Sequence, residues 1–239
     1  MGVNLELSKK LTARLQKIAD QVTIGHRVAD IGTDHGYIPV YLLKNKISPF
    51  VIAGDINEGP LKCAEDNIVS NNLSHCIETR LGSGLSILKP KEVDTIIIAG
   101  MGGLLISELL NNSKEIAQSL DTLILQPMQA QSELREYLVG NDFIIKKDIL
   151  VKEGHHIYEI IVAKPGKQRA VDSIYYEVGF YIYNNPGLLA MEFIDRKIKT
   201  TKEIIRNIGE NISGHSAEKL KDMKKKLKKL EEVYLCLQR

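Results

Sequence analysis

The chain has 239 residues, of which 44% are hydrophobic and 26% charged, as expected for a soluble protein of one or two domains. The uncharged stretch over residues 95–107 is too short to cross a membrane. We expect no signal peptide, and three scattered cysteines without metal-ligand spacing favour a reducing cytoplasm and no metal site. The charge is uneven, because residues 186–239 hold 13 Lys/Arg against 8 Asp/Glu. This basic end favours a polyanionic partner, and a solvated helical surface is the alternative.

The N-terminal segment predicts an amphipathic helix that begins near Ser8, as its cap or within its first turn. The apolar residues at helical spacing are Leu7, Leu11, Leu15, Ile18 and Val22. A buried strand is predicted over 27–31, and a second helix over 37–44.

Between that strand and the second helix lies Asp30-Ile31-Gly32-Thr33-Asp34-His35-Gly36, the layout of a nucleotide-binding turn. A dinucleotide would place its pyrophosphate over the turn, where Asp34 stands in place of a glycine and would repel it. S-adenosylmethionine carries no phosphate and has an ammonium and a cationic sulfur. Asp30 and Asp34 therefore favour this cofactor over NAD. The alternative is that the glycines only form a tight turn.

Alternating strands and helices continue along the chain. Strands are predicted over 50–55, 77–81, 94–99 and 123–127, and an antiparallel pair over 143–150 and 158–163. Helices are predicted from Pro60, over 104–110, and over 131–139 with Gly140 as the stop. This order predicts an α/β fold with a doubly wound sheet. Asp55 follows Gly32 at the interval typical of a ribose-binding carboxylate, and a helix N-cap is its alternative role.

The pattern changes after Pro165. An aromatic cluster, which we interpret as the seam between two domains, contains Tyr175, Tyr176, Phe180, Tyr181 and Tyr183. Two helices are predicted over 188–208 and 217–237, and their spacing is that of a helical hairpin or short coiled coil, or of a dimer interface. Their apolar stripes contain Leu188, Met191, Ile194, Ile198, Ile205 and Ile208, then Leu220, Met223, Leu227, Leu230, Tyr234 and Leu237. We expect domains over 1–165 and 166–239.

Four predicted strand ends carry ligand-type residues, namely Asp30–Gly36, Asp55, Gly82-Ser83-Gly84 and Ala99–Gly103. Together they resemble the class I S-adenosylmethionine-dependent methyltransferases. The strings Ala29–Gly36, Ile98–Gly103 and Leu125-Gln126-Pro127 more narrowly resemble the bacterial tRNA adenine-22 N1-methyltransferase family (TrmK). The general pattern has a third glycine where this chain has Asp34, and usually an Asn/Asp-Pro-Pro-aromatic string in place of Gly100–Gly103. The resemblance covers nearly the whole chain.

The resemblance implies a Rossmann-like domain that binds S-adenosylmethionine and a helical domain that contacts tRNA. The implied contacts to the methionine end of the cofactor come from Asp30, Gly32 and Gly36, with Thr33 and Asp34 in the same turn. Asp55 is implied at the ribose, Ile56 or Asn57 beside the adenine, and Gly82 and Ser83 at the adenine rim. The floor under the methyl group is implied to be Ala99, Gly100, Met101 and Gly102, and for Met101 core packing is an equal alternative.

The implied reaction moves a methyl group to adenine N1, so the base must leave its stack. Asp34 is the candidate catalytic residue, because a carboxylate could stabilise the cationic product or take a proton from the exocyclic amine. It could equally order the turn or hold the cofactor's ammonium. His35 is a weaker candidate, and His155 and His156 are expected to be solvated.

Competing functions are a methyltransferase of another RNA, a protein or a small molecule, and a non-catalytic tRNA-binding module. An NAD-dependent oxidoreductase is a more distant alternative, because of the acids in the turn. We expect a cytoplasmic enzyme with tRNA as partner, no membrane association, and a monomeric or weakly dimeric state.

Overall fold

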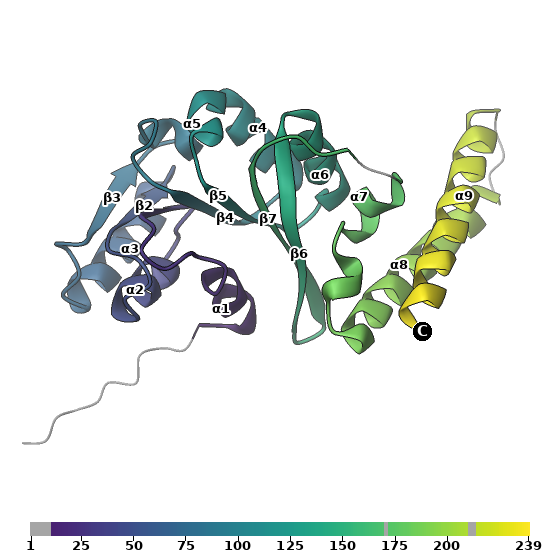
Figure 1. Ribbon diagram of the computed structural model, residues 1–239, viewed down its shortest axis with the longest axis horizontal. Helices are drawn as coiled ribbons and strands as arrows, with labels where there is room; N and C mark the ends of the chain where they lie inside the picture. The colour runs from purple at the N-terminus through teal and green to yellow at the C-terminus, as the bar shows by residue number, and fades with distance from the viewer. Residues whose placement is uncertain (1–10, 170–171, 210–213) are drawn as a thin grey trace, which may run out of the picture. The chain divides into compact units, whose positions relative to one another are not determined.

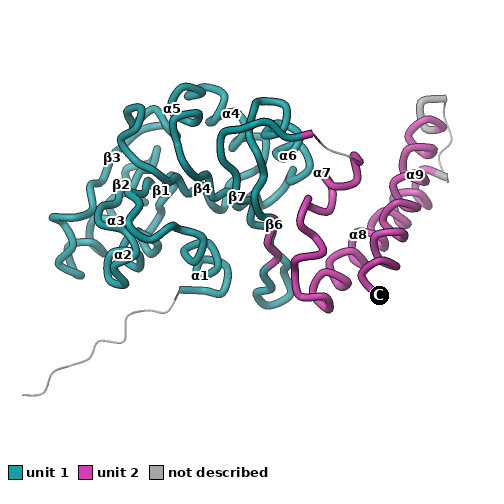
Figure 2. The backbone as a smooth tube through the Cα atoms, in the orientation of Figure 1, with its two compact units in different colours: residues 1–147, 151–168 teal, residues 148–150, 169–239 magenta. Residues whose placement is uncertain are grey.

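The computed structural model describes residues 11–169, 172–209 and 214–239. They divide into two compact units (Figure 2). The first contains the described residues up to Lys147 and Val151–Gln168, and the second contains Asp148–Leu150 and the described residues from Arg169 onward. Within the described ranges, no helix combines the length and apolar character needed to cross a lipid bilayer.

In the described chain, a seven-stranded sheet organises the first unit, in the order β3-β2-β1-β4-β5-β7-β6 (Figure 1). The strands are β1 (Val28–Ile31), β2 (Val51–Asp55), β3 (Ile77–Leu81), β4 (Thr95–Met101), β5 (Thr122–Pro127), β6 (Phe143–Glu153) and β7 (His156–Pro165). Strands β1 to β5 pair in parallel, whereas β7 pairs antiparallel with β5. The chain order reverses between β1 and β4, and ligands bind at such a switch point, outside the carboxyl ends of the strands.

Helical connections return the chain between the parallel strands, as parallel pairing requires. They are α1 (Ala13–Ala19) ahead of the sheet, then α2 (Tyr37–Lys44), α3 (Glu58–Ser70), the 3-10 helix η1 (Gly84–Ile87), α4 (Gly103–Asn112), α5 (Lys114–Gln118) and α6 (Gln131–Gly140). The apolar face predicted for α3 is buried, since Leu61, Ala64 and Ile68 are all in the core. The predicted doubly wound sheet is confirmed.

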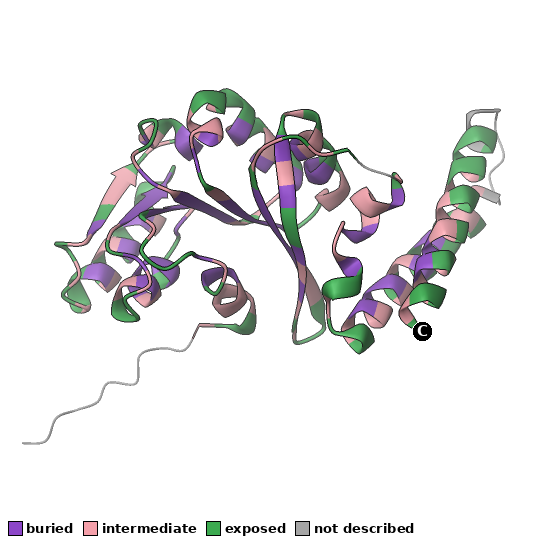
Figure 3. Cartoon of the chain, in the orientation of Figure 1, coloured by how far each residue is buried: buried purple, intermediate pink, exposed green. Residues whose placement is uncertain are grey.

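The central strands form the core of the first unit (Figure 3). Every residue of β1 and β2 is buried, which is typical of parallel strands covered on both faces. Strand β4 is buried over its first four residues and becomes accessible at Ala99, Gly100 and Met101. The core therefore ends at the carboxyl edge of the sheet, where polar residues and glycines begin.

The second unit is helical beyond the three residues that it takes from β6. It contains α7 (Ile174–Val178), the 3-10 helix η2 (Ile182–Asn184), α8 (Gly187–Gly209) and α9 (Gly214–Leu237). Helices α8 and α9 pack on one another, and their buried residues include Ile194, Ile198 and Leu230. Phe180 contacts the rings of Tyr175 and Tyr176, so part of the predicted aromatic cluster lies together within this unit.

Two ends of predicted helices differ from the sequence-based expectation. Thr12 caps α1, because its Oγ1 accepts a hydrogen bond of 3.4 Å from the Leu15 amide, and the helix starts only at Ala13. The predicted cap Ser8 and the apolar Leu7 lie outside the described residues. At α6 the helix includes Gly140, and Asn141 is the C-cap.

One member of the predicted apolar stripe of α8 is misplaced. Leu188 is 85% exposed, whereas Ala190 and Phe193 are buried. The buried face of α8 therefore begins after Leu188, later than the predicted stripe.

Candidate functional site

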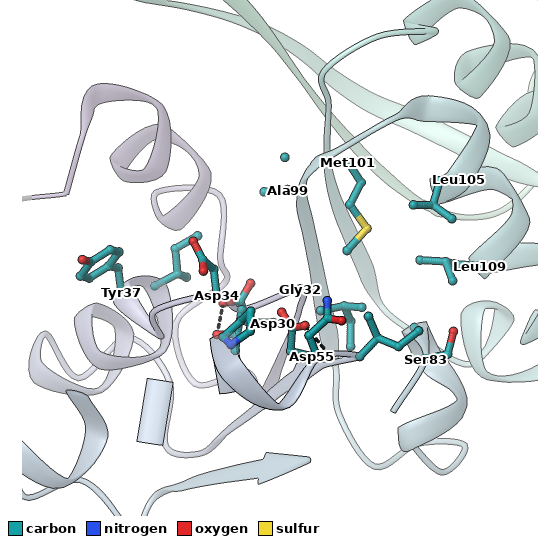
Figure 4. Close-up of a pocket in the computed structure, with 18 of the residues that line it drawn as sticks. Asp30, Gly32, Asp34, Tyr37, Asp55, Ser83, Ala99, Met101, Leu105 and Leu109 are labelled. Carbon is teal, nitrogen blue, oxygen red and sulfur yellow. Dashed lines mark hydrogen bonds between the residues drawn. The ribbon is translucent and has the colours of Figure 1, made fainter. Parts of the chain in front are cut away.

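A cavity of about 550 Å³ opens at the carboxyl ends of β1, β2 and β4 (Figure 4). All of the predicted cofactor-binding residues line it except Gly36 and Gly102. The residues that do are Asp30, Gly32, Thr33, Asp34, Asp55, Ile56, Asn57, Gly82, Ser83, Ala99, Gly100 and Met101. Four segments far apart in the sequence thus meet at one site, and its size is that of a small-molecule pocket.

Asp30, at the end of β1, is a buried carboxylate. Its Oδ2 accepts a hydrogen bond of 2.8 Å from the Thr33 hydroxyl. Burial, against the lowering effect of the Thr33 hydrogen bond and with a smaller contribution from the charge of Asp55, raises the pKa of Asp30 to about 7. A cation or a hydrogen-bond donor in the cavity would stabilise the ionised form of this carboxyl.

Asp55 ends the neighbouring strand β2. Its Oδ1 accepts the Asn57 amide at 2.9 Å, and its carbonyl accepts the Gly82 amide at 2.9 Å. The N-cap of α3 is Asn57, so Asp55 is not the capping residue itself. The local bonds hold its carboxylate at the cavity wall, where it can accept hydrogen bonds from a ligand's hydroxyl groups.

The turn after β1 uses the left-handed backbone region three times. Gly32 has a φ of 77°, Asp34 of 52° and Gly36 of 66°. A Cβ at Gly32 would collide with the methyl end of the Met101 side chain, so this glycine leaves that side chain room at the cavity wall. Gly36 instead faces α3, because a Cβ there would lie 3.3 Å from the Cβ of Ala64. Gly36, the last residue of the predicted turn, therefore packs against α3 and does not line the cavity.

The end of β4 is bulged. The register with β5 shifts between Ala99 and Met101, which leaves Gly100 between them with a φ of 82°. A Cβ added to Gly100 would meet no atom within 4 Å. The backbone at Gly100 is therefore not covered by a side chain in the direction of the hypothetical Cβ, which leaves room for a flat ligand beside it. Gly102 is the N-cap of α4 and faces Gln129, 3.4 Å from a hypothetical Cβ.

The cavity has walls that sequence reasoning missed. Figure 4 shows Asp34 and Tyr37 on one side and Met101, Leu105 and Leu109 on the other. Leu105 and Leu109 share a face of α4 at helical spacing, a signal that also fits plain core packing. The other unpredicted lining residues are Arg14, Leu15, Ile38 and Pro60, while Ile31 and Gly84 belong to the predicted strand-end segments without an implied contact of their own.

Of the three histidines considered as candidates, His35 lies next to the cavity-lining Asp34, whereas His155 and His156 lie in another turn. His35 Nε2 lies 3.7 Å from Asp34 Oδ1, and its ring stacks on Tyr37 with centroids 5.3 Å apart. Asp34 and His35 are both exposed at the lip of the turn. His155 and His156 are exposed at the β6–β7 turn, and neither lines the cavity.

The donors and acceptors present fit S-adenosylmethionine better than a pyrophosphate. Three carboxylates, Asp30, Asp34 and Asp55, line the cavity and favour a cationic ligand that carries hydroxyl groups. The bare backbone at Gly100 leaves space for a second reactant. Among the described residues, no group of three or more His, Cys, Asp or Glu side chains gathers as a metal site.

The fold and the acid-lined cavity define a Rossmann-like methyltransferase, and the family model described as "Methyltransferase domain" matches residues 11–161. The chain is 31% identical over 230 residues to the tRNA (adenine(22)-N(1))-methyltransferase of Bacillus subtilis, covering 94% of this chain and 97% of the relative. The chain belongs to the tRNA (adenine(22)-N(1))-methyltransferase family, TrmK.

Solved structures agree with this assignment. The B. subtilis m1A22 tRNA methyltransferase TrmK superposes with a TM-score of 0.86 at 30% identity, over 94% of this chain and 99% of that one. TrmK of M. capricolum, solved with the cofactor product S-adenosylhomocysteine, has a TM-score of 0.80 at 27% identity, over 96% and 99% of the two chains. The similarity extends through the helical second unit.

Proposed function

We propose that this protein transfers a methyl group from S-adenosylmethionine to N1 of adenosine 22 in tRNA. The observation that carries the proposal is the match to the B. subtilis enzyme over 94% of this chain and 97% of the relative. A shared methyltransferase domain alone would leave the substrate open, but here the helical second unit is included. The acid-lined cavity supports the choice of cofactor.

We assign the cofactor's ribose to Asp55 and its methionine end to the turn at Asp30 and Gly32. Asp55 offers carboxylate oxygens to hydroxyl donors, with one oxygen already held by the Asn57 amide. Ionised Asp30 would face the positive charges of the amino-acid end. When bound, the cofactor supplies an electrophilic methyl group, and the protein's task is to align the acceptor with it.

Adenine N1 reacts through its ring lone pair, so methylation needs no proton removal and leaves a positive charge on the base. We assign the acceptor to the space beside Gly100, where no side chain fills the wall. Asp34 is then the carboxylate placed to stabilise the cationic base. Its side chain is 69% exposed, so its field is screened by solvent and its contribution depends on the base covering it.

We assign tRNA contact to the second unit, and specifically to one face of α9. Lys221, Lys224 and Lys228 are exposed and recur at helical spacing. By contrast, Lys226 and Lys229 form ion pairs with Glu177 and Asp172 inside the same unit. Outward lysines position RNA through its phosphates without reading its sequence.

The alternative functions are weaker. A tRNA-binding module without activity would not need carboxylates at the cavity wall, and a small-molecule methyltransferase would not need the basic face of α9. Because tRNA is the proposed substrate, we place the protein in the cytoplasm.

The direct test is to incubate the purified protein with S-adenosylmethionine and unmodified tRNA and to digest the RNA to nucleosides. Mass analysis should find 1-methyladenosine, and its amount should grow with enzyme and cofactor. Bound tRNA without any methylated nucleoside would support the binding module instead. Methylation of a protein or small molecule with tRNA left unmodified would refute the proposed substrate.

A further inference from the structure

Arg14, on α1, is a cation in a cavity whose other charged lining residues are the acids Asp30, Asp34 and Asp55. Its Nη1 donates a hydrogen bond of 2.6 Å to Gln126 Oε1, and its guanidinium carbon lies 5.4 Å from the centre of the Tyr158 ring. Its backbone amide donates to Glu153 Oε2 at 2.8 Å. The side chain is thus held by β5 and β7, the backbone of α1 is held by β6, and the side chain reaches the cavity wall.

The partners of this guanidinium leave its charge available. Gln126 is an uncharged amide and Tyr158 offers a ring face, and within the described residues no carboxylate forms an ion pair with the Arg14 side chain. Glu153 is the nearby acid, and the backbone amide of Arg14, which its carboxylate accepts, is the main cause that lowers the pKa of Glu153, with the charge of Arg14 the smallest. An arginine has five N–H donors in a planar fork, so donors remain for a ligand.

Gln126 is the positioning residue for Arg14. It is 0% exposed, at the end of β5 opposite Ala99 of β4. Its Nε2 donates to the Pro127 carbonyl at 3.1 Å, so its amide has one orientation and presents Oε1 to the guanidinium. A buried glutamine with both ends engaged fixes the direction of Arg14 as well as its reach.

The sheet order separates Arg14 from the cofactor's methionine end. Gln126 lies on β5, and Asp30 lies on β1 with β4 between them. Two steps across a sheet span about 10 Å. The guanidinium is therefore held from the β5 side of β4, by a residue that pairs with Ala99 next to the bare backbone of Gly100, where the acceptor is assigned.

We propose that Arg14, oriented by Gln126, binds a phosphate of the nucleotide whose adenine is methylated. A planar guanidinium suits bidentate contact with phosphate oxygens, and an RNA substrate brings such a group wherever a nucleotide enters. The contact would hold the extruded nucleotide at the cavity while leaving the base free to meet the methyl group. This inference rests on the proposed function, since it assumes an RNA acceptor.

The test compares Arg14→Gln with Lys17→Gln, which removes one positive charge from the same helix but does not line the cavity. Binding of unmodified tRNA is measured over a range of salt, and binding of S-adenosylhomocysteine by calorimetry. Arg14→Gln should weaken tRNA binding by about tenfold to a hundredfold and flatten the slope of log affinity against log salt by about 0.7–0.9. Lys17→Gln should change both much less, and cofactor affinity should stay within about twofold in both variants.

A second comparison guards against a purely structural effect. Arg14→Lys keeps the charge but not the planar fork, so it should keep the salt slope and recover part of the affinity. Gln126→Leu should weaken tRNA binding, yet add little in the Arg14→Gln background, because both changes remove one contact. Affinities are expressed per folded molecule, with thermal unfolding measured alongside.

Three results would overturn the inference. Equal tRNA affinity of Arg14→Gln and Lys17→Gln would mean that Arg14 contributes only a general positive charge and no specific phosphate contact. A loss of S-adenosylhomocysteine affinity in Arg14→Gln would assign the guanidinium to the cofactor's carboxylate. Weaker tRNA binding with an unchanged salt slope would assign it to the base. A parent protein that does not methylate tRNA would refute the proposed function itself, which the parent measurement reveals separately.

Discussion

Asp30 and Asp55 end adjacent parallel strands and face one cavity, and their carboxyl groups are electrostatically coupled. The pKa of Asp30 is raised from 3.8 to about 7. Burial is the largest cause, the hydrogen bond from Thr33 lowers the pKa, and the charge of Asp55 raises it by a smaller amount. The folded protein without ligand therefore holds a proton on Asp30 at pH values where the unfolded chain has lost it. A cationic ligand would displace that proton.

This coupling predicts a pH dependence of cofactor affinity. Affinity for S-adenosylmethionine should fall as the pH drops from about 8 to about 6, because protonated Asp30 no longer attracts a cation. Asp30→Asn should bind weakly at both ends of that range and show no step. Calorimetric titration across the range measures it. An affinity of the parent protein that is constant with pH would contradict the assignment of Asp30.

Asp55→Ala should weaken cofactor binding by about 1–3 kcal/mol, the usual loss for a hydrogen bond to a charged group. Asp66→Ala is a matched control, since Asp66 is an exposed acid of α3 outside the cavity. It should leave affinity unchanged. If Asp55 only supports the start of α3 through the Asn57 amide, its variant will lose thermal stability and keep its affinity.

Asp34→Asn tests the role of the exposed carboxylate. Asparagine tolerates the left-handed conformation that Asp34 adopts, so the turn should persist. We expect a lower turnover number with a nearly unchanged cofactor dissociation constant. Parallel loss of cofactor affinity would assign Asp34 to binding, and an unaffected rate would remove it from the site.

The α9 lysines divide into two sets with different expected effects. Replacing Lys221, Lys224 and Lys228 by Ala should weaken tRNA binding, flatten its salt dependence and leave thermal stability nearly unchanged. Replacing Lys226 and Lys229 should lower thermal stability, because each pairs with an acid of the same unit. Salt titrations and thermal unfolding of both variants measure the difference. Unchanged tRNA binding in the first variant would mean that this face does not contact RNA.

The structure also revises which lysines belong in such an experiment. From the sequence, Lys224, Lys225, Lys228 and Lys229 are equivalent members of one basic run. The ion pair of Lys229 with Asp172 depends on how α9 packs within its unit, and Asp172 is 57 residues away in the sequence. A local sequence pattern cannot predict a contact between residues so far apart in the chain.

Local sequence pattern predicted most of the parallel sheet because β1, β2, β4 and β5 are largely apolar and each has an acid, a glycine or a proline at or next to its end. The bounds of β3 and α2 agree with the prediction, since alternation in one and the Gly36 start of the other are strong signals. Thr12 was missed as a cap because Ser8 offers the same chemistry one turn earlier. Leu188 was wrongly assigned to the buried face of α8, because helical spacing shows which residues share a face but not where along the helix that face is buried.

The candidate site was predictable where it depends on backbone. Glycines and acids at strand ends belong to segments whose meeting place follows from the topology. Arg14 was not predictable, because a cation between apolar helix positions is the ordinary pattern of a solvated face. Only its bond with the buried Gln126, 112 residues away, places it at the cavity.

The proposed reaction methylates one nucleotide, so tRNA transcripts that differ at that nucleotide are its sharpest test. Two tRNA transcripts, one with adenosine and one with guanosine at position 22, are incubated with the protein and S-adenosylmethionine. Reverse transcription, which 1-methyladenosine blocks, then maps any modification. We predict a stop at position 22 in the adenosine transcript and none in the guanosine transcript. Equal methylation of both, or a stop elsewhere, would contradict the account.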